Sequence, residues 1–135
     1  FLQHGKNPFL RYLQRDVAGA GARITVNDHA RLGVGLLSEN EEDLSGLTTR
    51  TERLATYFHD DYEISENMDF NLTIYYQPSI DESEDFKASL IGALDFKMNE
   101  KFKVTLQYNT FYDSRPPVTA LKRDEGIATN FSYSF

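Results

Sequence analysis

The stretch EGIATNFSYSF at residues 125–135 alternates between two kinds of side chain. Every second residue, from Ile127 to Phe135, is aromatic, aliphatic or Thr, and small or polar residues lie between them. Because successive side chains of a β-strand point to opposite faces, this pattern predicts a strand with one apolar and one polar face. A tilted strand of about 9 to 11 residues is also long enough to cross a bilayer.

The aromatic residues Phe131, Tyr133 and Phe135 resemble the terminal signature of bacterial outer-membrane β-barrels. In such proteins the last strand is recognised by the barrel-assembly machinery. The resemblance implies three partners: that machinery, outer-membrane lipid and lipopolysaccharide. We therefore treat these three residues as a candidate assembly signal.

The same alternation recurs along the chain, with mainly apolar residues at even positions. It predicts six further strands, at residues 10–26, 30–37, 50–64, 68–78, 86–98 and 102–112. Residues 38–49 are rich in Glu and Asp and are expected to form an exposed loop. Asp60 interrupts the apolar face of the 50–64 segment, and a bulge or a position near the membrane rim would accommodate it.

Three short turns, at residues 27–29, 65–67 and 99–101, are each flanked by apolar residues that we expect to pair across a hairpin without a slip in register. The expected pairs are Val26 with Ala30, Ile64 with Met68, and Met98 with Phe102. The remaining connections are longer and more polar. Short turns on the periplasmic side and long loops outside are typical of outer-membrane barrels, which predicts a C-terminus in the periplasm.

Composition excludes several classes of protein. Hydrophobic residues make up 40% of the chain, yet there is no run of 18 apolar residues, so a membrane-spanning helix is excluded. The net charge of -7 argues against nucleic acid as a partner. With no Cys, the chain has neither a disulfide framework nor a zinc-thiolate site.

A soluble antiparallel sheet, with the apolar face as its core, would show the same alternation. Two features favour the membrane: predicted strands well above the usual length of about 5 or 6 residues, and aromatic residues that bracket the apolar faces. The aromatic pairs that suggest two girdles are Phe70 with Tyr76, Phe86 with Phe96, and Phe102 with Tyr108.

The predicted fold is thus an all-β, antiparallel transmembrane β-barrel that occupies residues 1–135 as one domain, with about seven strands visible. Bacterial barrels of one chain have even strand numbers. We therefore expect an odd number of strands to precede residue 1, together with any export signal.

Several segments resemble one family, the salt-induced outer-membrane proteins, which are described only as a domain of unknown function. The resemblance rests on Arg15 with the GAG at 19–21, on the glycines of the 32–37 segment, on YDSRPP at 112–117 with KRD at 122–124, and on the aromatic end at 131–135. It implies an outer-membrane barrel of unassigned function, associated with the envelope or with salt stress. It transfers no catalytic residue.

Charged residues at odd positions are expected to face the lumen of the barrel. They are Arg15, Arg23, Arg31, Lys87, Asp95, Lys97 and Lys103. In a narrow barrel they would form ion pairs that plug the lumen, because an unpaired charge is costly to desolvate. In a wide barrel they would line an aqueous pore and set its selectivity.

Other polar groups have two interpretations each. His59 and Asp61 share one face of their strand, so they could form a base with its orienting carboxylate or a metal site, or simply a polar strand end near the periplasmic rim. The acidic segments 39–43 and 81–85 could hold divalent cations that bridge to lipopolysaccharide, or be solvated surface. Gly19, Gly21, Gly33 and Gly35 are expected to relieve crowding where strands curve.

The sequence predicts no catalytic residue, cofactor or metal site, and no enzyme. A barrel enzyme acting on lipids would need a nucleophile and a His together near the outer rim, whereas His29 and His59 fall at the predicted periplasmic end. Three functions stay open: a structural barrel of the envelope, a passive channel for ions or small solutes, and a soluble ligand-binding β-barrel.

Overall fold

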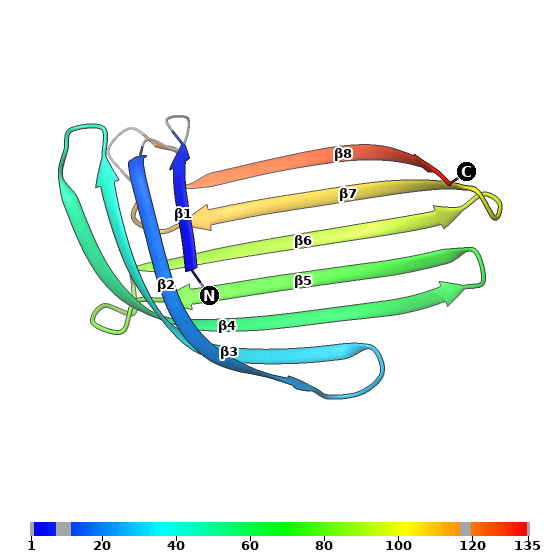
Figure 1. Cartoon of the computed structure of the whole chain (residues 1–135), viewed down its shortest axis with the longest axis horizontal. Helices are drawn as coiled ribbons and strands as arrows, with labels where there is room; N and C mark the ends of the chain where they lie inside the picture. The colour runs from blue at the N-terminus through cyan, green and yellow to red at the C-terminus, as the bar shows by residue number, and fades with distance from the viewer. Residues whose placement is uncertain (1, 8–11, 117–119, 135) are drawn as a thin grey trace.

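A single antiparallel sheet of eight strands, each paired with its neighbours in sequence, forms the computed structural model of this chain (Figure 1). The structure describes residues 2–7, 12–116 and 120–134. The strands are β1 (Leu2–Asn7), β2 (Tyr12–Thr25), β3 (Ala30–Asp43), β4 (Thr48–Ser65), β5 (Met68–Pro78), β6 (Phe86–Lys97), β7 (Phe102–Asp113) and β8 (Arg123–Tyr133). None of the described residues belongs to a helix that is long and apolar enough to span a membrane.

All seven predicted strands are present as β2 to β8, and the short strand β1 precedes them. The predicted all-β, antiparallel class is confirmed. Closure into a barrel is not observed, because no pairing joins β1 to β8 within the described part of the chain. The sheet is instead an open, curled one.

The prediction of a loop at residues 38–49 is wrong. β3 continues to Asp43 and β4 starts at Thr48, so the two strands remain paired as far as Glu42 and Thr48. Successive side chains still point to opposite faces through this polar stretch, but the side chains on both faces are now polar or charged. The hydrophobic pattern therefore ended before the strand did.

Two of the three predicted hairpin pairs are confirmed. Val26 donates its N–H to the carbonyl of Ala30 at 2.8 Å, and Met98 donates to the carbonyl of Phe102 at 2.9 Å. The third is wrong, because the register shifts between Glu63 and Ser65, and Met68 pairs with Ser65. The extra residue of this bulge is Ile64.

Asp60 lies in an unbroken ladder, opposite Ala30 on one side and Leu72 on the other. Of the two explanations offered for it, the bulge is therefore absent, and the position near a membrane rim stays a prediction.

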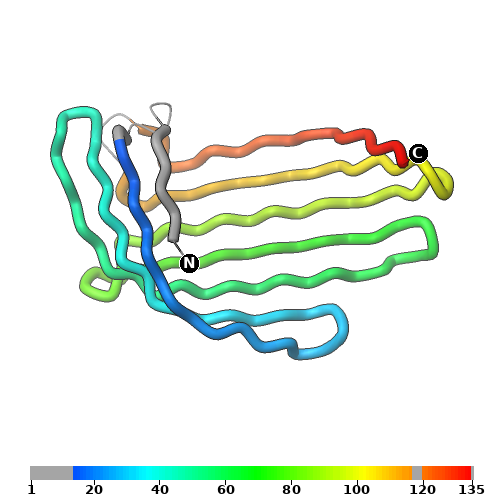
Figure 2. Tube along the Cα trace, viewed as in Figure 1, coloured from blue at the N-terminus to red at the C-terminus, as the bar shows by residue number. Residues whose placement is uncertain are grey.

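Strands β2, β3 and β4 bend strongly while β5 to β8 stay nearly straight, as the Cα trace shows (Figure 2). Glycines permit a close approach of β2 and β3. A Cβ atom on Gly21 would lie 2.6 Å from the carbonyl oxygen of Val34, and one on Gly35 would lie 2.7 Å from that of Ala20. These distances agree with the predicted role of the glycines in relieving crowding.

The convex and concave faces of the curled sheet differ in chemistry. Large apolar side chains are exposed on the convex face, among them Ile127 at 81% and Phe131 at 70%. Val17, 4% exposed, is the one buried hydrophobic residue among those described. The buried polar residues are Glu39, Arg53, Ser79, Lys87 and Asp113. Most of the buried side chains among those described are therefore charged.

Candidate functional site

A cluster of ion pairs occupies the concave face near the ends of the strands that lead into the longer connections. Glu39 of β3 is at its centre and is 3% exposed. Its carboxylate accepts hydrogen bonds from Arg15 of β2, from Arg53 Nε at 2.8 Å and from Lys87 Nζ at 2.8 Å. One carboxylate thus joins side chains from β2, β4 and β6.

Arg53, which is 4% exposed, uses the other edge of its guanidinium for a second carboxylate. Nη1 and Nη2 donate to the two oxygens of Asp85 at 3.1 and 3.2 Å, and Nη1 also donates to the carbonyl of Gln77 at 3.3 Å. This two-pronged geometry matches the planar fork of arginine to the two oxygens of a carboxylate. It fixes the connection between β5 and β6 to the wall of the sheet.

Lys87 of β6 extends the cluster further. Its Nζ lies 3.2 Å from Glu41 and 3.7 Å from Asp113 in addition to its contact with Glu39. Arg15 lies 3.9 Å from Glu41 as well. Three cations and four carboxylates therefore form one network, which is named below as the Glu39 cluster: Arg15, Glu39, Glu41, Arg53, Asp85, Lys87 and Asp113.

A second set of ion pairs lies on the concave face at the short-turn end. Asp69 and Asp95 are directly opposite each other in the ladder, and so are Lys97 and Lys103. Each lysine instead forms an ion pair with one of the aspartates: Lys97 Nζ lies 2.8 Å from Asp69, and Lys103 Nζ lies 3.2 Å from Asp95. The like-charged residues are thereby compensated.

His59 and Asp61 share the concave face, as predicted, and their side chains meet: His59 Nε2 lies 2.8 Å from Asp61 Oδ2. His59 Nδ1 lies 2.9 Å from the hydroxyl of Thr73, and Arg31 donates to Asp61 at 2.9 Å. A hydroxyl, an imidazole and a carboxylate in series have the connectivity of a nucleophile and its base.

Such a group also needs donors for an oxyanion, and here the neighbouring N–H groups lie in strands paired on both sides. No group of three or more potential metal-ligating side chains occurs in the described ranges. The arrangement therefore offers ion pairing and hydrogen bonding between β3, β4 and β5.

The structure thus brings six of the seven predicted inward charges into ion pairs, Arg15 and Lys87 in the Glu39 cluster and Arg31, Asp95, Lys97 and Lys103 at the short-turn end. Arg23 differs from them: within the described part of the chain it forms no ion pair.

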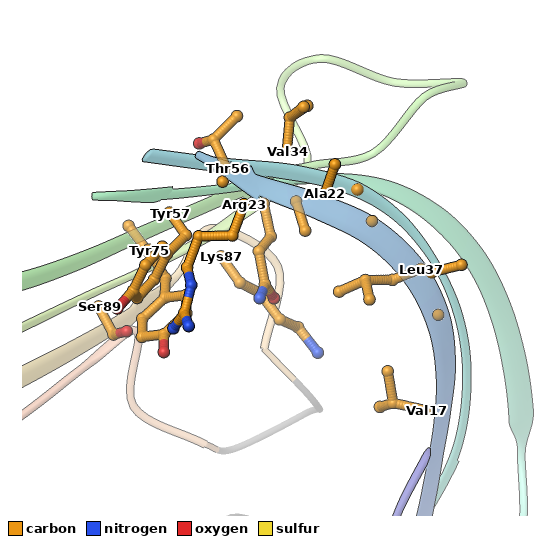
Figure 3. Close-up of a pocket in the computed structure, with 18 of the residues that line it drawn as sticks. Val17, Ala22, Arg23, Val34, Leu37, Thr56, Tyr57, Tyr75, Lys87 and Ser89 are labelled. Atoms are coloured by element: carbon orange, nitrogen blue, oxygen red, sulfur yellow. The ribbon is translucent and has the colours of Figure 1, made fainter. Parts of the chain in front are cut away.

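Arg23 instead lines a hollow of about 900 Å³ on the concave face. Tyr57, Tyr75, Val17 and Leu37 also line it, and in the close-up all of them extend to the same side of the sheet as Arg23 (Figure 3). Val34 and Thr56 point to the opposite side. The hollow lies between the two sets of ion pairs.

On the convex face the aromatic residues gather at two levels. Phe86 stacks with Tyr112 at 5.4 Å and contacts Tyr76 at 5.5 Å, near the longer connections. Phe102 and Phe131 stack at 6.3 Å near the short turns. Aromatic contacts therefore occur at two levels, with Tyr112 rather than Tyr108 in the one near the longer connections. That these levels are membrane girdles stays a prediction.

The candidate assembly residues Phe131 and Tyr133 lie exposed on β8, opposite Val104 and Phe102 of β7. Phe135 lies outside the described residues. The sheet therefore presents two of the three aromatic side chains at the β8 edge.

The predicted acidic loops divide into different environments. Glu39, Glu41, Glu42 and Asp43 belong to β3 rather than to a loop, and Glu39 and Glu41 are in the Glu39 cluster. Asp81, Glu82 and Glu84 are exposed, with Glu82 paired to Arg115, whereas Asp85 binds Arg53. A cation site built from Glu39 or Glu41 is thus contradicted, since lysine and arginine already compensate these carboxylates.

Sequence reasoning missed the centre of the Glu39 cluster. Glu39, Glu41, Arg53 and Asp113 have the same odd parity as the predicted inward residues. Extending that parity through the polar ends of the strands would have placed them on the concave face. Asp85 lies before β6 and carries no such signal.

The model of one protein family matches residues 1–135, and its description is "Protein of unknown function, DUF481". That description mentions neither salt induction nor the outer membrane, so these parts of the resemblance remain predictions. No curated protein and no solved structure matches the chain.

Proposed function

We propose that this chain, which belongs to the DUF481 family of proteins of unknown function, forms the wall of an outer-membrane β-barrel. The Glu39 cluster obstructs the lumen of that barrel. The role of the protein is then structural in the bacterial envelope rather than the free passage of solutes. The short turns and the C-terminus face the periplasm in this proposal.

The inverted distribution of side chains carries the proposal. A soluble sheet of this size would hide its apolar face, yet here Ile127, Phe131 and many other large apolar residues are exposed on the convex face. Meanwhile the buried side chains are mostly charged. Lipid outside and a polar lumen inside would satisfy both faces.

The apolar band crosses the sheet obliquely, which also supports a membrane. On β3 the exposed residues Leu32, Val34 and Leu36 centre the band on Val34. A line through directly paired residues leads from Val34 through Thr56, Tyr76, Ala88 and Tyr112 to Arg123. On β8 the band is centred near Thr129 instead, between the exposed Ile127 and Tyr133.

This offset gives a tilt. Arg123 and Thr129 are separated by six residues, or about 20 Å of strand, while the five strand spacings from β3 to β8 span about 24 Å. The band is therefore inclined by roughly 40° to the perpendicular of the strands. Barrel strands in membranes tilt by about 35–45°. A flat soluble core requires no such inclination.

Obstruction of the lumen is favoured over free conduction by the Glu39 cluster. Four of its seven charged residues, Glu39, Arg53, Lys87 and Asp113, are buried, and the network is paired across five strands, whereas a residue that lines an aqueous pore would be expected to face water. A buried network that joins β2, β3, β4, β6 and β7 acts as a brace inside the curled sheet.

The first test is heat-modifiability. The full-length protein is extracted from the envelope with detergent and run on a gel with and without boiling. We expect the unboiled sample to migrate differently, because a closed barrel resists the detergent. A soluble product without a shift would contradict the membrane proposal and favour a soluble ligand-binding barrel, with the apolar face covered by protein.

Conductance in planar bilayers separates the structural role from a passive channel. We expect the unaltered protein to show no steady open channel. The double variant Glu39→Ala and Arg53→Ala, which removes the centre of the cluster, is expected to conduct if it inserts. A large, steady conductance of the unaltered protein would instead establish the channel.

A further inference from the structure

We propose that the hollow beside Arg23 is a binding site for a small organic monoanion, a carboxylate attached to an apolar ring. The inference concerns the concave face alone, so it does not depend on whether lipid or protein covers the convex face. It adds a ligand to a sheet for which only a structural role has been inferred above.

Arg23 is the first reason. Every other inward-facing cation identified from the sequence is compensated by a carboxylate, such as Asp61 for Arg31 and Glu39 for Arg15. Arg23 has no such partner within the described residues, although it faces the same concave side. An arginine whose fork is unoccupied offers two parallel N–H donors, which match a carboxylate in both shape and charge.

The surroundings of Arg23 are the second reason. The rings of Tyr57 and Tyr75 lie 5.1 Å apart, and Figure 3 shows the Arg23 side chain extending toward them. Val17, Leu37 and Phe111 add apolar surface to the same hollow. A mostly apolar wall with a few polar groups is typical of pockets for small organic molecules, and aromatic rings stack on such walls.

The size and charge of the hollow narrow the class of ligand. About 900 Å³ is ample for a ring of six atoms and its substituents. Arg15 and Lys87 also line the hollow, but the carboxylates of Glu39, Glu41 and Asp113 already compensate their charges. One available positive charge favours a monoanion over a doubly charged phosphate, because a second negative charge would remain uncompensated.

Binding of benzoate to the purified full-length protein, measured by isothermal titration calorimetry, tests the site. The protein is kept in detergent or in buffer, whichever the extraction requires. We expect benzoate to bind and benzylamine, which has the same ring with a positive charge, not to bind. Inorganic phosphate is expected to bind at least tenfold more weakly than benzoate.

Substitutions test whether benzoate binds at Arg23. Arg23→Gln is expected to weaken benzoate binding at least tenfold, since it removes a charge-assisted contact, and Arg23→Lys should lose less. Lys97→Gln is the matched control: it also removes an inward-facing cation, but one paired with Asp69 outside the hollow, and should leave binding unchanged. Circular dichroism checks that each variant retains its sheet.

The proposal is overturned if benzoate does not bind, if Arg23→Gln binds as well as the unaltered protein, or if benzylamine or phosphate binds as tightly as benzoate. Because the protein's location is established separately by heat-modifiability, failure of the ligand site leaves the membrane proposal intact. Likewise, failure of the heat-modifiability test would leave the ligand-site proposal intact.

Discussion

Arg53 and Glu39 are not partners in the β-ladder, yet their side chains form a buried ion pair with Nε and Oε2 2.8 Å apart. Arg53 is directly opposite Leu37, and Glu39 is opposite Thr51. The contact is therefore diagonal on the concave face. It ties β3 to β4 at the level where Lys87 reaches in from β6.

Removing the carboxylate of Glu39 should destabilise the protein strongly. Glu39→Gln leaves Arg15, Arg53 and Lys87 without the anion that all three contact, and breaking a buried pair on one side costs about 3–5 kcal/mol. We expect a lower temperature for the loss of the folded species on gels.

The matched control is Glu42→Gln. Glu42 lies on the same strand, faces the opposite side and makes no ion pair with the residues described. Its substitution should leave the transition temperature nearly unchanged, and an equal loss for both variants would show that the buried network is not the cause.

Placing arginine on either side of the sheet can test which face contacts lipid. Leu90→Arg and Leu106→Arg put a charge on the convex face, where lipid contact would cost about 2–4 kcal/mol near the bilayer centre. We expect both variants to be lost from the envelope fraction. Gln107→Arg, one residue from Leu106 but on the concave face, should be recovered normally. Equal recovery of all three would refute the proposed lipid face.

Glycine at the bend of β2 and β3 is expected to contribute to the stability of the sheet. Gly21→Ala would place a Cβ atom 2.6 Å from the carbonyl oxygen of Val34, which forces the two strands apart. A loss of about 1–3 kcal/mol in the free energy of unfolding is expected from such overpacking, measurable by urea titration followed by circular dichroism. Gly92→Ala is the control, because nothing lies within 4 Å of a Cβ atom there. The crowding explanation fails if both variants behave alike.

A pair of engineered cysteines can test the extension of β3 and β4 beyond the apolar residues. Ser38 and Glu52 are directly opposite, and the Ser38 hydroxyl donates to Glu52 at 2.9 Å. Since the chain has no Cys of its own, Ser38→Cys with Glu52→Cys should form one disulfide on mild oxidation. Ser38→Cys with Thr51→Cys, on opposite faces, should not. Equal cross-linking of both pairs would indicate a mobile loop instead of a ladder.

Alternation of apolar and polar residues was enough to predict most of the ladder. β5 begins at Met68 and ends at Pro78 as predicted, because every even residue between them is apolar and a turn precedes it. The pattern failed where polarity no longer differed between faces. At Ser38 to Asp43 both faces are polar, so the hydrophobic signal ends although the strand continues.

The candidate site was harder to predict for a related reason. Arg15 and Lys87 were expected to face inward, but their common partner Glu39 was assigned to a loop because it sits among other acids. Which carboxylate meets which cation depends on how far the sheet curls. That curvature is set by close packing between backbones, as at Gly21 and Gly35, and local sequence patterns do not encode it directly.

The continuation of β3 and β4 past the level at which β5 to β8 end has a practical consequence. The hairpin closes at a tight loop in which Asp43 accepts N–H groups from Ser45 and Leu47 at 2.8 and 3.0 Å and Gly46 adopts a positive φ of 82°. The strands that lead to this loop are polar on both faces, and Leu44 and Leu47 are the exposed apolar residues at its tip. In the outer-membrane orientation proposed above, this tip would stand clear of the outer rim, so a short peptide inserted after Gly46 is expected to be displayed to antibodies on intact cells.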